Sequence, residues 1–159
     1  MTYQVDNYIQ GLQQRVAEQS HKLIAQFEYL KTLRFADEVD HLQIISSLGE
    51  EEIAFTLFSM EDLFTEAYAE DDTNGFATSL DFIEEFAFDV HDSSDEFETF
   101  YEDNDLERAS IHVLGDWVRT CFEKADGPAI PLPVYFGIHD DIEMLDLKSG
   151  KWFNPDDVS

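Results

Sequence analysis

The stretch from Phe35 to Glu107 contains no lysine and no arginine, although aspartate and glutamate recur throughout it. Isoleucine, leucine and phenylalanine are interspersed among these acids at regular spacings, so we expect the stretch to fold rather than to form an acidic tail. Folding brings its like charges together, and their mutual repulsion destabilises the compact state. This acidic middle of the chain, residues 35–107, therefore predicts a folded domain with a strongly anionic surface.

The remaining composition fits a single compact domain over residues 1–159. Hydrophobic residues make up 43% of the chain, which is enough for a core, while the formal net charge is −27. A surface of this charge repels nucleic acid and anionic membranes, and it attracts basic proteins and cations. The alternative interpretation is an acidic surface that serves only solubility, or adaptation to high salt.

A long N-terminal helix is predicted over residues 3–33. Ile9, Val16, Leu23 and Leu30 recur every seven residues, and a companion row adds further apolar positions but carries glutamine at its middle. Such a helix either lies across the core of its own chain or pairs with a second copy. The glutamines favour the first alternative. The second alternative would be a homodimer formed through the N-terminal helix.

Strands are predicted in two places, namely a hairpin near residues 41–58 and a C-terminal meander over 132–153. In the second strand of the hairpin, Ile53, Phe55 and Leu57 alternate with less apolar residues, which is the period of a half-buried strand. A helix beginning at Ser47 is the alternative there. The predicted fold class is α+β, with an antiparallel sheet of about four to five strands covered by helices.

The other helices are predicted from apolar residues three and four positions apart, over residues 60–69, 80–90, 95–104 and 105–125. The last of these is apolar on nearly all sides, so it is expected at the centre of the fold, with Cys121 as a buried core thiol.

Carboxylates line the outer sides of two of these predicted helices, and they are our candidate partner-binding residues. They are Asp81, Glu85, Asp89 and Asp92 on the first helix, and Asp95, Glu98 and Glu102 on the second. On a helix these side chains recur about every 5–6 Å, similar in scale to successive phosphates along a nucleic-acid strand. Such a row could occupy the basic groove of a nucleic-acid-binding protein.

One segment has the spacing of a calcium-binding EF-hand loop. Glu70, Asp72, Asn74 and Asp81 would supply its side-chain ligands, with Gly75 at the sixth place and helices on both sides. Glutamate at the first place and aspartate at the twelfth depart from the usual pattern. These four residues are weak metal candidates, and turn and helix-cap chemistry explains them without a cation.

No catalytic motif is found, so no enzyme activity and no cofactor are predicted. The run His139-Asp140-Asp141 at a strand end is a weak catalytic or metal candidate, best explained as a polar turn. A single cysteine, no leader-like N-terminus and no membrane-length apolar run are typical of a cytoplasmic protein.

In general character the chain resembles DNA-mimic proteins and bacterial toxin-immunity proteins, which are small, acidic and cytosolic. The resemblance implies a non-catalytic interaction protein that binds and blocks a basic partner, such as a nucleic-acid-binding protein or a nuclease toxin. One alternative is a calcium-binding protein that uses residues 70–81. The other is an acidic domain of unknown function whose charge serves only solubility.

Overall fold

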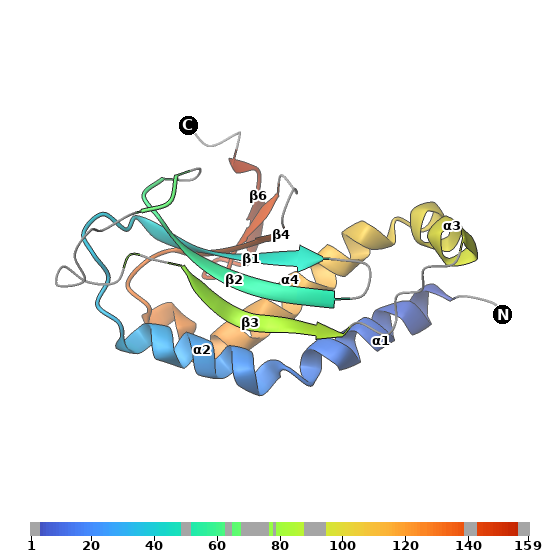
Figure 1. Cartoon of the computed structure of the whole chain (residues 1–159), viewed down its shortest axis with the longest axis horizontal. Helices are drawn as coiled ribbons and strands as arrows, with labels where there is room; N and C mark the ends of the chain where they lie inside the picture. Colours follow the sequence, from blue (N-terminus) through green and yellow to red (C-terminus); the bar gives the residue numbers. More distant parts are fainter. Residues whose placement is uncertain are drawn as a thin grey trace.

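The computed structural model describes residues 4–48, 52–62, 65–67, 77, 79–87, 95–138 and 143–155. Over these ranges the fold is α+β, as predicted, with one sheet packed against a layer of helices (Figure 1).

The sheet has six strands in the order β3-β2-β1-β4-β5-β6. The strands are β1 (His41–Leu48), β2 (Glu52–Met60), β3 (Leu80–Ala87), β4 (Val134–Ile138), β5 (Met144–Asp146) and β6 (Lys151–Phe153). The hairpin and the C-terminal meander are thus confirmed. However, β1 and β4 pair in parallel while the other neighbours are antiparallel, so the sheet is mixed rather than antiparallel.

The described helices are α1 (Val5–Ala17), α2 (Ser20–Thr32), α3 (Asp95–Asp103) and α4 (Leu106–Lys124), followed by a short 3-10 helix, η2 (Gly127–Ala129). The last two α-helices confirm the predictions for residues 95–104 and 105–125. The first two replace the single helix predicted over 3–33, because the chain bends at Glu18 and Gln19. Neither proline nor glycine stands at this bend, so tertiary packing rather than a helix breaker places it there.

The apolar row of α1 and α2 faces the core of its own chain. Leu12, Leu23 and Leu30 are completely buried and Val16 is nearly so, whereas Val5 at the start of the row is exposed. This confirms that the N-terminal segment lies across the core. Most residues that the homodimer hypothesis needs at a helix–helix interface therefore pack within one chain, and the homodimer itself stays a prediction.

Helix α4 lies at the centre of the molecule, as predicted, and contacts both the sheet and the other helices. The Trp117 ring lies 5.5 Å from that of Phe55 on β2, and the Phe122 ring lies 5.3 Å from that of Phe27 on α2. Cys121 is buried on the same helix, and burial raises the pKa of its thiol. It is thus a core residue, as the sequence indicates.

Two predicted helices in the acidic middle are wrong. Residues 80–87 form β3, paired with β2, instead of the beginning of a helix over 80–90. The second wrong helix is the one predicted over residues 60–69. There Met60 ends β2 and pairs with Glu66 in an isolated bridge, so the described part of this segment turns back onto the strand instead of forming a helix.

The register of β3 explains why its sequence has a helical period. Two irregularities in the pairing with β2 insert extra residues, so Ile83 is opposite Phe55 while Asp81 is opposite Thr56. Phe82 and Ile83 are consequently both buried although they are adjacent, whereas a regular strand would place them on opposite faces. Bulges of this kind convert the two-residue period of a strand into the three- and four-residue spacing expected of a helix.

The two faces of the sheet have different surroundings. Helix α4 runs behind the sheet, and α1 and α2 lie along its β3 edge (Figure 1). Leu42, Ile44 and Phe55 point to this helical layer and are fully buried. Among the described residues no helix covers the opposite face, which we call the open face of the sheet.

Candidate partner-binding surfaces

The first set of predicted partner-binding carboxylates is not on a helix. Asp81 and Glu85 lie in β3, and Asp81 is exposed, while Asp89 and Asp92 are outside the described residues. At about 3.3 Å per strand residue, Asp81 and Glu85 are about 13 Å apart along the chain, roughly twice their spacing on a helix. The prediction of a phosphate-like row of carboxylates over these four residues is therefore wrong.

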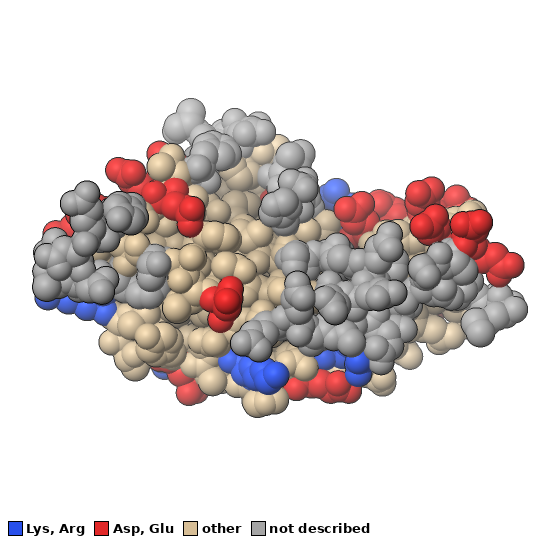
Figure 2. Space-filling model, in the orientation of Figure 1, with Lys and Arg blue, Asp and Glu red and all other residues tan. Residues whose placement is uncertain are grey.

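The second set keeps its predicted arrangement on α3. Asp95, Glu98 and Glu102 are exposed, whereas Phe97 is buried on the other side of the helix and Phe100 packs against the core. More exposed carboxylates surround them, and the α3 acidic surface consists of Asp95, Glu96, Glu98, Glu102, Asp103, Asp105 and Glu107. Figure 2 shows acidic side chains gathered at this end of the molecule. The first basic residue after it is Arg108, which contacts Glu143 at 3.5 Å.

An aromatic cluster holds α3 against α1 and α4. The Tyr8 ring of α1 lies 6.0 Å from Phe97 and 5.9 Å from Tyr101. The Tyr8 hydroxyl lies 2.8 Å from that of Ser110, which donates a hydrogen bond to the Leu106 carbonyl at 2.7 Å. Aromatic contacts and a buried hydroxyl pair thus fix the inner side of the helix, so its acidic side faces solvent.

This cluster predicts a loss of stability in alkali. Burial raises the pKa values of Tyr8 and Tyr101 above the ordinary value of about 10. The unfolded chain therefore releases these protons first, and the free energy of unfolding should fall as the pH rises above about 10. Urea unfolding followed by circular dichroism at increasing pH measures this loss. Tyr101→Phe should flatten the pH dependence, and an equally steep fall in that variant would contradict this assignment.

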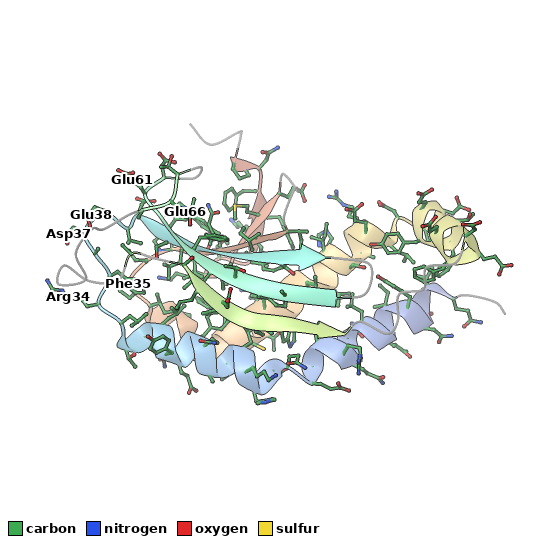
Figure 3. All side chains as sticks on the ribbon, viewed as in Figure 1. Arg34, Phe35, Asp37, Glu38, Glu61 and Glu66 are labelled. Carbon is green, nitrogen blue, oxygen red and sulfur yellow. The ribbon has the colours of Figure 1, made fainter. Side chains whose placement is uncertain are left out.

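A second acidic surface lies at the opposite end of the molecule from α3 and was not predicted. The Asp40 amide donates a hydrogen bond to the Met60 carbonyl at 2.7 Å, and the bridge between Met60 and Glu66 brings the following turn to the same place. The sheet-end acidic surface consists of Asp37, Glu38, Asp40, Glu61, Asp62 and Glu66, all exposed. Figure 3 labels four of them, from the turn before β1 and the turn after β2.

The sequence contained a signal for this surface. A hairpin over residues 41–58 places the beginning of its first strand beside the end of its second, and acids flank both positions. A helix over residues 60–69 would continue away from the end of the strand, whereas the observed turn brings Glu66 back beside Met60.

A buried histidine lies next to the sheet-end acidic surface. The Nδ1 atom of His41 is 2.9 Å from a carboxylate oxygen of Asp40, and its Nε2 atom is 3.0 Å from the Gln43 amide nitrogen. The His41 side chain is only 1% exposed. If Gln43 donates to Nε2, then Nδ1 carries the proton and donates to Asp40, so the contacts select one tautomer. Both ring nitrogens are occupied by contacts within the fold, which makes His41 a structural residue.

The metal candidates gain no geometric support. Glu70, Asp72 and Asn74 lie outside the described residues, as do His139, Asp140 and Asp141, and Asp81 lies in a strand. An EF-hand loop is followed by a helix, but here β3 begins at Leu80. In the part of the chain that the structure describes, three or more metal-ligating side chains nowhere gather into a potential site.

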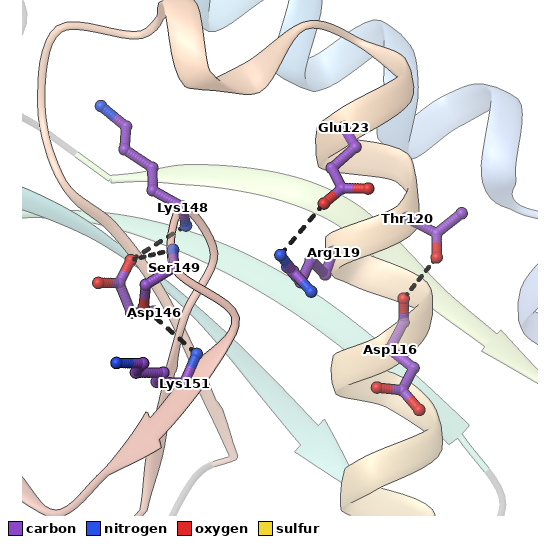
Figure 4. A network of polar contacts seen from close by, with 8 residues as sticks. All are labelled: Asp116, Arg119, Thr120, Glu123, Asp146, Lys148, Ser149 and Lys151. Atoms are coloured by element: carbon purple, nitrogen blue, oxygen red, sulfur yellow. Dashed lines mark hydrogen bonds and ion pairs between the residues drawn. The ribbon is translucent and has the colours of Figure 1, made fainter.

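Arg34 is exposed at the same end of the molecule as the sheet-end acidic surface (Figure 3). Other basic residues lie on α4 and in the C-terminal meander, where polar contacts surround Asp146 (Figure 4). Asp146 accepts hydrogen bonds from the backbone amides of Lys148 and Ser149 at 3.0 and 3.4 Å. The Lys148 ammonium donates to the Ile130 carbonyl at 2.6 Å, and Arg119 pairs with Glu123 on α4 at 3.3 Å. This side of the molecule therefore mixes both signs of charge, unlike the α3 acidic surface.

No protein-family model matches the chain, and no curated protein or solved structure does so. Among the described residues, none of the helices combines the length and the apolar character needed to cross a membrane.

Proposed function

We propose that this protein is a non-catalytic, cytoplasmic interaction protein that binds a basic protein and blocks its nucleic-acid-binding surface, as a DNA mimic or a toxin-immunity inhibitor does. The single observation that carries the proposal is the α3 acidic surface. Asp95, Glu98 and Glu102 all point outward from one helix, at intervals of about 4.5 and 6 Å along its axis.

The anchoring of α3 supports this assignment. A row of carboxylates competes with phosphates best when it is fixed in space before the partner arrives, because less conformational freedom is then lost on binding. Phe97 is buried and Tyr101 packs against Tyr8, so the helix is anchored along its inner side. The sequence has no lysine or arginine between Arg34 and Arg108, so α3 itself carries no basic side chain. The net charge of −27 steers basic proteins toward the molecule.

The experiment is a binding assay against a panel of purified basic nucleases and DNA-binding proteins, at low and at physiological ionic strength. For a true partner, affinity should fall at least about tenfold between about 0.05 and 0.15 M salt, because the screening length shortens to about 8 Å. Duplex DNA should displace the protein from the same partner. Affinity that does not change with salt, or simultaneous binding of DNA and this protein, would argue against the proposal.

A further inference from the structure

The open face of the sheet carries a group of apolar side chains between strands. Phe58, Gln43 and Tyr135 form one cross-strand row over β2, β1 and β4. In the next row, Ile45 of β1 is opposite Gly137 of β4, and the row continues through Met144 of β5 to Phe153 of β6. The open-face patch consists of Ile45, Phe58, Tyr135, Met144 and Phe153.

Close packing joins neighbouring members of this patch, while Gln43 lies between Phe58 and Tyr135. Gly137 has no side chain, and a Cβ atom there would lie 3.2 Å from Met144 Cε and 3.5 Å from Ile45 Cδ1, so these two side chains meet above it. The Phe153 ring contacts that of Tyr135 edge-on, with centroids 5.0 Å apart. Met144 is buried, but the other four members of the patch retain partial exposure to solvent.

Carboxylates lie directly beside the patch. The Tyr135 ring is 5.0 Å from that of His41, which contacts Asp40 of the sheet-end acidic surface. Asp146 of β5 is the cross-strand neighbour of Tyr135. Burial raises the pKa of Tyr135, and the negative charges of Asp146 and Asp40 add to this effect. The exposed Lys151 is opposite Asp146 at the β6 edge of this face, so the acids predominate at the β1–β2 end of the patch. An apolar centre with acids at that end is complementary to a segment that is apolar on one side and basic beside it.

We propose that the open-face patch and the sheet-end acidic surface together bind an amphipathic basic segment of the protein partner. Apolar side chains of that segment contact Phe58, Tyr135 and Phe153, while its lysines and arginines pair with Asp37, Glu38, Glu61 and Glu66. The inference rests on the proposed function, to which it adds a second contact surface and the chemistry of the partner. A second copy of this chain does not fit, because its own charge of −27 would bring like surfaces together.

Two synthetic helical peptides with equal numbers of lysines test this inference against the full chain by calorimetry at physiological salt. One peptide has leucines along one side, and the other has glutamines there. The leucine peptide should bind at least about tenfold more tightly, because only its apolar side can cover the patch. In amide NMR spectra of the full chain, its addition should shift resonances of β1, β2 and β4.

Matched variants separate the two parts of the surface. Phe58→Ser or Phe153→Ser should lower the affinity for the leucine peptide to about that of the glutamine peptide. Tyr29→Ser is the control, since Tyr29 on α2 is 47% exposed and lies outside the patch. Replacing Asp37, Glu38, Glu61 and Glu66 with their amides should weaken binding of both peptides.

Equal affinity of the two peptides, or shifts confined to α1, α2 and α3, would overturn this inference while leaving the proposed function in place. Failure of both peptides to bind would likewise overturn this inference, whereas the proposed function fails only if no basic protein of the panel binds. The NMR map uses the unaltered chain, so the result does not depend on whether a serine variant folds.

Discussion

Replacing Asp95, Glu98 and Glu102 with Asn, Gln and Gln should lower the affinity for a basic protein partner by about a hundredfold or more. Each carboxylate that pairs with a cation of the partner should contribute at least about 1 kcal/mol, and three such losses amount to about two orders of magnitude in the dissociation constant. The amides keep the size of the side chains, and Phe97 on the inner side remains unchanged, so α3 should stay folded. Calorimetry or surface plasmon resonance measures the loss, with thermal melting as the check on folding.

The matched control changes net charge by the same amount on other elements. Asp6, Glu28 and Asp116 are exposed on α1, α2 and α4. Their conversion to amides should reduce affinity only severalfold, through the weaker long-range field. Equal losses from the two sets would show that overall charge alone matters, and the assignment of α3 as the docking element would then be wrong. If neither set of substitutions lowers the affinity, the acidic surface serves only solubility.

Gly127→Ala should destabilise the fold by about 2–3 kcal/mol, the cost of overpacking a rigid site. A Cβ atom at Gly127 would lie 2.2 Å from Cδ2 of Phe122. That ring cannot move aside easily, because it is completely buried and packs against Phe27. The melting temperature should fall by about 5–10 °C for a domain of this size, and urea unfolding gives the corresponding free energy.

Gly137→Ala provides the comparison within the same chain. The nearest atom to its added Cβ is the terminal Cε of Met144, at 3.2 Å, and this flexible side chain can adjust. We expect a change within about 1 kcal/mol. A similar loss in both variants would mean that close approach to Phe122 is not the cause.

The sequence by itself determined the elements whose burial follows an undisturbed local period. Phe97, Phe100 and Tyr101 recur at helical spacing in α3, and α4 is apolar on nearly all sides, so both helices follow from the pattern. Ile53, Phe55 and Leu57 alternate as a strand requires, and β2 was predicted for that reason. The exposed carboxylates of α3 follow in turn, because the aromatic side of the helix fixes the opposite side.

Pairing between distant segments decided the rest. Only the register with β2 makes residues 80–87 a strand, since its bulges give Phe82 and Ile83 a spacing that also fits a helix. The parallel contact between β1 and β4 joins segments far apart in the chain, and no local period encodes it. The bend at Gln19 likewise lets α1 reach Ser110 while α2 packs against Phe122, both on α4. The sheet-end acidic surface and the open-face patch arise from such contacts, because each collects residues that only the folded chain brings together.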